Sequence, residues 1–279
     1  MMQIIHNGKF IDAGSAVVTS ESRGLRFGDG CFETMRIVNG KIALKELHFE
    51  RLFSSLESMK FNLPESFTAS KIEQEIFSLI KRNGHQVNCK VRLNVVSGNG
   101  GLYDIDNNNE YLIESWALEK SGYEINENGL AVDVYKDARK SCDQFSHIKS
   151  NNFLPYVMAA KWVQQQQLDD AILLNSFDRI ADATIANVFI VKDGIIKTPA
   201  LSEGCIAGIM RKHLISCCHK EGIPVEETKI TADDLMNASE VFLTNIIRGI
   251  KWVKTIGKNN YSFQIAQLLH EKVVKPLSS

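Results

Sequence analysis

The chain lacks several features that mark particular classes of protein. Its 279 residues include 32 basic and 33 acidic side chains, a net charge of −1, so no excess of positive charge indicates nucleic acid or an anionic membrane as a partner. No apolar run approaches the roughly 20 residues of a membrane-spanning helix. The N-terminal stretch MMQIIHNGKF also lacks an apolar leader with a small-residue cleavage site. We therefore expect a cytoplasmic protein that contacts neither nucleic acid nor membrane.

Cysteine is present, but not in an arrangement typical of a metal site. The chain has six cysteines and no export signal, so we expect reduced thiols. The neighbours Cys217, Cys218 and His219 suggest zinc, but zinc sites usually combine one closely spaced pair of ligands with a second pair elsewhere. The sequence has no such second pair, and Cys217 also fits the apolar stripe of a helix. We expect no metal site.

The order of apolar patterns predicts a mixed α+β chain in two domains. Ser121-Gly122 is the best candidate linker, which gives a smaller α/β domain over 1–120 and a larger mixed β domain with helices over 121–279. Asn39-Gly40 is a hairpin signal, and Thr231 is a good N-cap for a short helix. The expected strands are 4–10, 32–38, 90–97, 110–118, 130–136, 171–175, 187–191 and 240–244. The expected helices are 44–62, 70–83, 153–167, 206–221 and 262–274.

The stretch RFGDGCFETMR, residues 26–36, combines glycines with arginines, as phosphate-binding loops do. The same composition is typical of a turn that leads into a strand. The residues after the glycines alternate like a strand, so no helix N-terminus is available here to receive a phosphate. We expect a turn that delivers a strand, with the glycines serving backbone geometry.

Lys149, in SHIKSNNFLPYV, has two interpretations. A lysine is by default a solvated surface residue. A lysine amine can also form a Schiff base with an aldehyde, and burial lowers its pKa readily. Nothing in the local sequence decides between the two.

Several segments, in order along nearly the whole chain, resemble the pyridoxal-phosphate enzymes of fold type IV, the class IV aminotransferase family. These segments are NGKF, RFGDGCFETMR, HFERL, KVRLNVVSG, KSNNFL, DATIANVFIVKDGIIKTP, GCIAGIMR and EVFLTN. The family contains branched-chain aminotransferases, D-amino-acid aminotransferases and 4-amino-4-deoxychorismate lyases. The resemblance implies a two-domain fold, pyridoxal 5'-phosphate as cofactor, a small-molecule substrate and a homodimer.

The resemblance assigns the cofactor's anchors. Lys149 would hold the cofactor as a Schiff base and then move the substrate's proton. The ring nitrogen needs a carboxylate, which in the family is usually a Glu five residues before the Asn of the next strand. Counting back from Asn187, itself a cofactor-binding position, that place holds Asp182, one methylene shorter. Asp182 could instead be a turn residue, and Asp178 is a weaker candidate.

The phosphate group needs backbone N–H groups and a cation. By resemblance, the amides of Ile209 and Met210 bind it, and Gly208 lets the backbone come close. Arg51 in HFERL matches the family's phosphate-binding arginine, although its helix face could equally be a solvated one. Asn245 matches a position that contacts the phosphate or the substrate carboxylate.

The pattern Thr244, Asn245 and Gly249 resembles the lyases more closely than the aminotransferases, so we favour a 4-amino-4-deoxychorismate lyase. The alternative is an aminotransferase of branched-chain or D-amino acids with 2-oxoglutarate as acceptor. A remote alternative is a degenerate, non-catalytic dimeric member. Each substrate-side arginine could also be a surface residue. The candidates for substrate binding are Phe27, Phe32, Arg36, Arg92 and Arg248.

Overall fold

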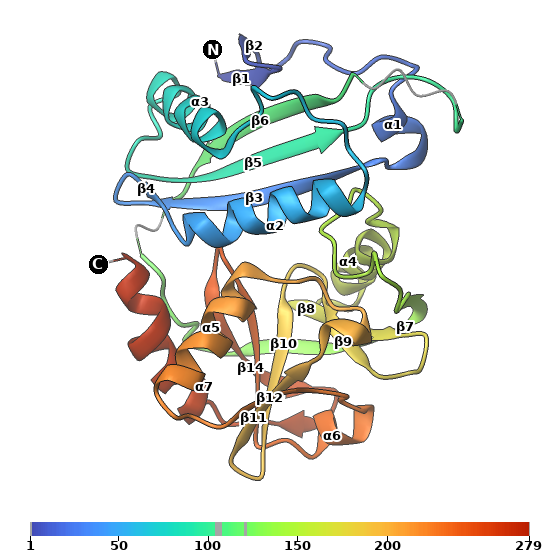
Figure 1. Ribbon diagram of the computed structural model, residues 1–279. Coiled ribbons are helices and arrows are strands. Elements are labelled where there is room, and N and C mark those ends of the chain that lie inside the picture. The colour runs from blue at the N-terminus through green and yellow to red at the C-terminus, as the bar shows by residue number, and fades with distance from the viewer. Residues whose placement is uncertain (1, 104–107, 120–121, 279) are drawn as a thin grey trace. The chain divides into compact units, whose positions relative to one another are not determined.

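Two units make up the computed structural model, which describes residues 2–103, 108–119 and 122–278 (Figure 1). Unit 1 comprises Met1–Ser121 together with the short segment Lys149–Asn152. Unit 2 comprises Gly122–Ile148 and Phe153–Ser279. The predicted domain boundary at residues 120–121 lies outside the described residues.

Unit 1 is built on a six-stranded antiparallel sheet with the order β2-β1-β6-β5-β3-β4. Its strands are β1 (Gln3–His6), β2 (Lys9–Asp12), β3 (Gly30–Val38), β4 (Lys41–Ile42), β5 (Asn88–Val96) and β6 (Glu110–Ala117). The predicted Asn39-Gly40 hairpin joins β3 to β4, and both residues have positive φ. The strand predicted over 4–10 is instead two strands, because Asn7 and Gly8 take positive φ and turn the chain back.

Two of the helices of unit 1 cover one face of this sheet. Unit 1 contains α1 (Arg23–Phe27), α2 (Lys45–Ser58) and α3 (Ala69–Arg82). Ile5, Ile113, Leu93 and Glu33 lie opposite one another across four strands and so share a face. All four are buried, with α2 packed on β3 and α3 packed on β1 and β6. The residues that alternate with these four along the strands, including Phe32 and Arg92, point to the opposite face.

Unit 2 contains a nine-stranded mixed sheet, with the order β12-β11-β10-β13-β14-β7-β8-β9 and β15 paired to β14. Its strands are β7 (Leu130–Lys140), β8 (Asp170–Asn175), β9 (Ile180–Ala183), β10 (Asn187–Lys192), β11 (Ile195–Pro199), β12 (Val225–Thr228), β13 (Glu240–Asn245), β14 (Gly249–Ile256) and β15 (Asn259–Asn260). β9, at one end of this order, also contacts β10, so the strands between them curl toward a barrel. Val188, Ile190, Val241 and Leu243 lie in the buried core of this unit.

The helices of unit 2 flank this sheet. They are α4 (Leu154–Gln166), α5 (Ile209–Lys220), α6 (Ala232–Met236) and α7 (Gln264–Leu269), with shorter helical turns η1 (Leu201–Glu203), η2 (His270–Val274) and η3 (Lys275–Ser278). The predicted N-cap is confirmed: the Thr231 hydroxyl accepts from the Asp234 amide, and the Asp234 carboxylate accepts from the Thr231 amide. Among the described residues, no helix is both long and apolar enough to span a bilayer.

The turn between β13 and β14 depends on Gly249. Its φ is +71°, and a Cβ built there would lie 2.7 Å from Val274 Cγ1 and 3.0 Å from the Tyr123 ring. Gly194, in the β10–β11 hairpin, has a similar φ of +76° but no atom within 4 Å of such a Cβ. The two glycines therefore share the backbone constraint, and only Gly249 adds a steric one.

We expect Gly249→Ala to lower the free energy of unfolding by about 1–3 kcal/mol more than Gly194→Ala does. Both substitutions place alanine in the left-handed region, at a cost of roughly 1–2 kcal/mol, so their difference isolates the overlap with Val274 and Tyr123. Urea denaturation of the two variants measures it. Equal losses would show that the core around residue 249 yields without cost.

Candidate active site

The backbone of Lys149 is held against the edge of β3. The Phe32 amide donates to the Lys149 carbonyl at 3.0 Å, and the Asn151 amide donates to the Gly30 carbonyl at 2.8 Å. Residues directly opposite in an antiparallel pair point to the same side. The half-buried Lys149 side chain accordingly lies over the Phe32 ring, with Nζ 4.4 Å from the ring centroid.

Arg92 reaches the same ring from β5. Its guanidinium carbon lies 3.8 Å from the Phe32 centroid, a distance at which the ring attracts a cation. Three residues predicted for the site, Lys149, Phe32 and Arg92, therefore meet on the face of the sheet opposite α2 and α3. The pair of cations makes this place suited to an anionic group.

A small cavity continues from Arg92 along this face. It has a volume of about 340 Å³ and is lined by Thr34, Lys90, Arg92, Glu114 and Trp116. Lys90 Nζ lies 4.3 Å from the Trp116 centroid. A ligand in this cavity would meet basic side chains, one acidic side chain and an aromatic ring.

Two of the predicted substrate-side residues lie apart from this group. Arg36 is on the same face of β3, but four residues beyond Phe32, about 13 Å along the strand. Phe27 is at the end of α1 and 41% exposed, with the Arg23 guanidinium 5.2 Å from its ring centroid. The substrate-binding roles of Arg36 and Phe27 stay predictions.

Arg51 lies on α2 and is bound by a buried carboxylate. Its Nε and Nη2 donate to the two oxygens of Glu33, each at 2.7 Å, and His48 Nδ1 is 2.7 Å from Glu33 Oε2. Glu33 follows Phe32 along β3, so its side chain points to the opposite face of the sheet, against α2. Glu33 and His48 were not predicted from the sequence, although a carboxylate that alternates with the apolar Cys31, Met35 and Ile37 along a strand is a usable signal.

The charges in this cluster shift two pKa values. Burial alone would raise the pKa of Glu33, but Arg51 and His48 hold it at about 2. Burial lowers the pKa of His48 despite the neighbouring Glu33 carboxylate, and the charges of Arg51 and Lys149 lower it further. The cluster thus orients Arg51 through an ionised glutamate, while its role as a phosphate ligand stays a prediction.

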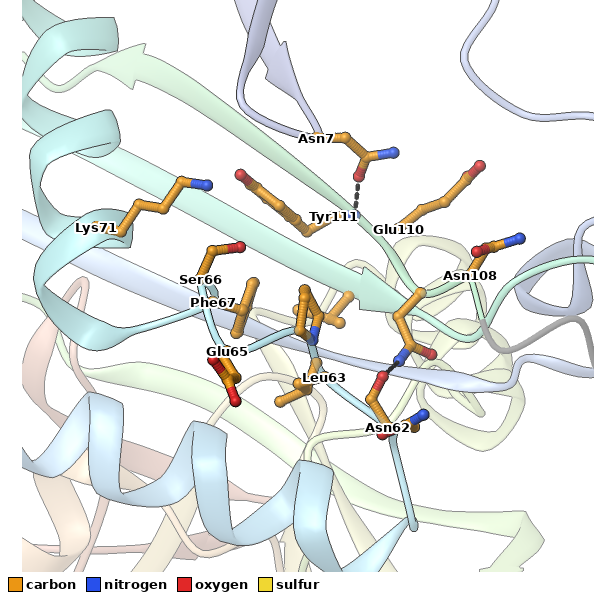
Figure 2. Close-up of a pocket in the computed structure, with 13 residues that line it drawn as sticks. Asn7, Asn62, Leu63, Glu65, Ser66, Phe67, Lys71, Asn108, Glu110 and Tyr111 are labelled. Atoms are coloured by element: carbon orange, nitrogen blue, oxygen red, sulfur yellow. Dashed lines mark hydrogen bonds between the residues drawn. The ribbon is translucent and has the colours of Figure 1, made fainter.

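A second cavity of unit 1, shown in Figure 2, contains none of the predicted site residues. It has a volume of about 670 Å³, lies between the α2–α3 connection and the start of β6, and is rich in amide side chains. Its residues include Asn7, Asn62 and Tyr111, whose hydroxyl donates to Glu75 at 3.0 Å. We assign it no part in the site.

In unit 2, Asp182 lies on the buried strand β9 rather than in a turn. Its Oδ2 accepts from Lys140 Nζ at 3.0 Å, from the Tyr156 hydroxyl at 2.8 Å and from the Ile206 amide at 3.1 Å. Its Oδ1 is buried and has no hydrogen-bond partner among the described residues. The weaker candidate, Asp178, is on an exposed turn and pairs with Arg139.

Ile206 connects Asp182 to the start of α5. The Ile206 carbonyl accepts from Asn187 Nδ2 at 2.8 Å, while its amide is bound by Asp182. Gly208 is the residue preceding α5, and a Cβ there would lie 1.9 Å from Asn187 Oδ1. Glycine is therefore required at 208 by direct contact, and Asp182, Asn187 and Gly208 form one linked group.

The N-terminus of α5 suits an anion. The first amides of a helix have no acceptor within it, and the helix dipole favours negative charge there. Ile209 and Met210 begin this 12-residue helix, and its first turn contains no acidic residue. The predicted phosphate contacts thus lie on a helix terminus that is tied to Asp182.

The turn after β13 carries Asn245 and Arg248. Asn245 Oδ1 accepts from the amides of Ile247 and Arg248 at 3.0 and 2.7 Å, so its side chain shapes the turn. Arg248 is exposed. Thr244, opposite Asn187 across the strand pair, has a buried hydroxyl without a partner among the described residues.

A family model, Amino-transferase class IV, matches residues 30–256. This range contains the residues that meet at Phe32 in unit 1 and the linked group of Asp182, Asn187 and Gly208 in unit 2. The chain belongs to the class IV aminotransferase family. Members of this family depend on pyridoxal phosphate, so the predicted family, enzyme class and cofactor are confirmed.

Three known proteins show the range of class IV aminotransferase relatives. A putative branched-chain-amino-acid aminotransferase from Methanocaldococcus jannaschii is 31% identical over 87% of this chain and 84% of its own. The branched-chain aminotransferase from Thermoproteus uzoniensis, solved with norvaline, is 25% identical, with a TM-score of 0.86 over 98% of this chain and 93% of that one. The 4-amino-4-deoxychorismate lyase from Pseudomonas aeruginosa is 21% identical, with a TM-score of 0.85 over 99% and 100%. The two structures confirm the predicted fold.

The residues of this class IV member fit pyridoxal phosphate. The buried Asp182 Oδ1 lacks a donor among the described residues, and a protonated ring nitrogen supplies one. The α5 terminus suits the phosphate, and Lys149 offers the amine. Unit 1 thus offers a partner for the aldehyde, and unit 2 offers partners for the ring nitrogen and the phosphate.

The Glu33 cluster gives a stability prediction. We expect Glu33→Gln to lower the free energy of unfolding by about 3–5 kcal/mol at neutral pH, because it removes the carboxylate that Arg51 and His48 share. The folded pKa of Glu33 is about 2, against an ordinary 4.5. Its contribution is thus complete above the ordinary value and is lost as pH falls toward 2.

Urea denaturation of both proteins at several pH values measures this. The gap between wild type and Glu33→Gln should shrink as pH falls below the ordinary value. Glu73→Gln, which breaks the partly exposed Lys45–Glu73 pair, is the control and should cost less than about 1 kcal/mol. A Glu33→Gln gap that stays constant down to the acid limit of folding contradicts the assignment.

Proposed function

We propose that the protein is a pyridoxal-phosphate lyase that acts on 4-amino-4-deoxychorismate. The reaction eliminates pyruvate and leaves 4-aminobenzoate, a precursor of folate. The observation that carries the proposal is the meeting of Lys149 and Arg92 on the Phe32 ring. It provides an amine, a carboxylate-binding cation and an apolar ring on one face, as an anionic cyclic substrate requires.

Lys149 would hold the cofactor through its amine, and the same amine would take the proton from the carbon next to the substrate nitrogen. The cofactor's ring supplies the electron sink when it is bound. Asp182 Oδ1 would accept a hydrogen bond from the ring nitrogen. The amides of Ile209 and Met210 would hold the phosphate, with Gly208 allowing close approach and Arg51 adding charge.

The remaining residues bind the substrate's acidic groups. Arg92 binds one carboxylate beside Lys149, and the cavity it lines extends past Lys90. Phe32 packs against the substrate. The candidates for further contacts with the substrate are Phe27, Arg36 and Arg248. Asn245 fixes the turn that carries Arg248.

The pattern Thr244, Asn245 and Gly249, which resembles the lyases, supports the lyase over other family reactions. Asn245 and Gly249, two of the positions that match the lyase pattern, both have structural work in this turn: one binds its amides, the other takes positive φ. The pattern is thus tied to a particular short turn.

A branched-chain or D-amino-acid aminotransferase is the second candidate. It is favoured by the 31% identity to the putative branched-chain-amino-acid aminotransferase from Methanocaldococcus jannaschii. It would use the same Lys149 and Asp182, with 2-oxoglutarate as acceptor. The two candidates differ only in the steps after the proton is removed.

We also propose a cytoplasmic homodimer. Val18 and Leu25 line one groove of unit 1 and are 57% and 67% exposed, which suits contact with a second copy. Light scattering of the purified protein tests this: a dimer mass is expected, and a monomer across micromolar concentrations contradicts it.

We expect purified protein to be yellow, and borohydride to fix the cofactor to the peptide that contains Lys149. Lys149→Ala should lower turnover by about 10³-fold or more, because it removes both the attachment point and the proton carrier. Lys161→Ala, on the exposed side of α4, is the control and should behave as wild type.

The assay supplies 4-amino-4-deoxychorismate and measures 4-aminobenzoate, in parallel with L- and D-amino acids plus 2-oxoglutarate. Formation of 4-aminobenzoate supports the lyase. Transamination without 4-aminobenzoate replaces it by the second candidate. Colourless protein that borohydride leaves unlabelled after addition of pyridoxal phosphate overturns both.

A further inference from the structure

Lys140, Tyr156 and Asp182 form a closed cluster inside unit 2. Lys140 ends β7 and Tyr156 is on α4, yet both donate to the same carboxylate oxygen, Oδ2. Lys140 Nζ also lies 4.8 Å from the Tyr156 centroid. All three side chains are buried: 8% of Lys140, 5% of Tyr156 and 1% of Asp182 is exposed. Lysine and aspartate are rarely buried to this extent, so the pair calls for a reason.

The pattern of donors is one-sided. Oδ2 receives three hydrogen bonds from three separate elements, whereas Oδ1 receives none from the described residues and is buried. A buried carboxylate oxygen without a donor is costly, and rotation of the carboxylate could share the donors between both oxygens. The three fixed donors hold the carboxylate plane against that rotation.

Tyr156 can act only as a donor here. Burial and the neighbouring Asp182 carboxylate raise its pKa well above its usual value, so the hydroxyl stays protonated. Its ring is fixed in turn by Phe153, whose centroid lies 4.3 Å away in a stacked arrangement. The three donors therefore hold Oδ2 in a fixed position, and this position sets the direction of Oδ1.

We propose that Lys140 and Tyr156 are positioning residues, which fix Asp182 through Oδ2 so that Oδ1 faces the ring nitrogen of the bound cofactor. This inference rests on the role proposed for Asp182. The ammonium group of Lys140 also pairs with the buried carboxylate at 3.0 Å, and a carboxylate is the acceptor that a protonated ring nitrogen needs.

The test measures the dissociation constant of pyridoxal phosphate by titration of apo-protein, and the pH at which the visible absorbance of the bound cofactor changes. We expect Tyr156→Phe to weaken cofactor binding about tenfold and to shift the absorbance transition, because one of three donors is lost. Tyr135→Phe is the matched control, since Tyr135 lies in the same core and packs on Trp162. It should change the dissociation constant by less than about twofold.

A double-mutant comparison shows whether Tyr156 acts through Asp182. In an Asp182→Asn background, Tyr156→Phe should cause no further loss of affinity beyond about twofold. Lys140→Arg should keep affinity near that of wild type, whereas Lys140→Met should lose about tenfold. If Lys140→Met fails to fold, the tyrosine variants decide alone. Tyr156→Phe with wild-type affinity, or with an equal loss in the Asp182→Asn background, overturns the inference.

A different result is expected if Asp182 does not bind the ring nitrogen of the cofactor. If Asp182→Asn binds the cofactor as tightly as wild type with an unshifted absorbance transition, Asp182 is not the ring-nitrogen partner. Asp182→Asn that weakens binding while Tyr156→Phe does not leaves the role of Asp182 intact and removes only the positioning by Tyr156.

Discussion

The hydrogen bonds between the Lys149–Asn151 backbone and the edge of β3 are the constraint on which the proposed chemistry depends. They fix which side of the sheet the lysine faces, because a residue opposite Phe32 shares its side. β3 therefore contributes functional side chains to both faces of the sheet. Phe32 on one side meets Lys149 and Arg92, and Glu33 on the other holds Arg51 and His48. A shift of one residue in this pairing would exchange the two sets.

In unit 2, hydrogen bonds fix the backbone of a loop rather than of a strand. The backbone of Ile206 is bound on both sides, by Asp182 through its amide and by Asn187 through its carbonyl. The start of α5 is thereby placed relative to β9 and β10 without any capping side chain. Gly208 completes the arrangement because its missing side chain leaves room for Asn187 Oδ1. In unit 2, buried polar side chains therefore place backbone as well as satisfy one another.

Local signals in the sequence predicted much of the fold. The Asn39-Gly40 hairpin and the Thr231 capping box depend on neighbouring residues only, and both are present. The predicted helix over 206–221 begins instead at Ile209, because Ile206 is bound by side chains distant in the sequence. Asp182 and Lys149 were selected by family resemblance, since no local pattern separates a buried aspartate from a turn residue.

Contacts between distant segments could not be predicted in this way. Lys140 and Tyr156 each look ordinary in their own stretch, and their importance appears only when β7 and α4 both reach Asp182 on β9. The pairing of Glu33 with Arg51 likewise appears only when β3 meets α2. Period and propensity carry no information on which buried polar side chains will pair. The Oδ1 of Asp182, which has no partner among the described residues, is likewise a property of three-dimensional placement.

The separation of Lys149–Asn152 from the rest of unit 1 also has a consequence for biogenesis. During synthesis, the first 121 residues leave the ribosome with the edge of β3 unpaired at Gly30 and Phe32, and its partner emerges only after β7 has been made. Unpaired strand edges invite association with other chains, and long-range pairing slows folding. Lys149 lies in the segment that closes this sheet edge, so completion of the unit 1 sheet and placement of the lysine occur in the same step.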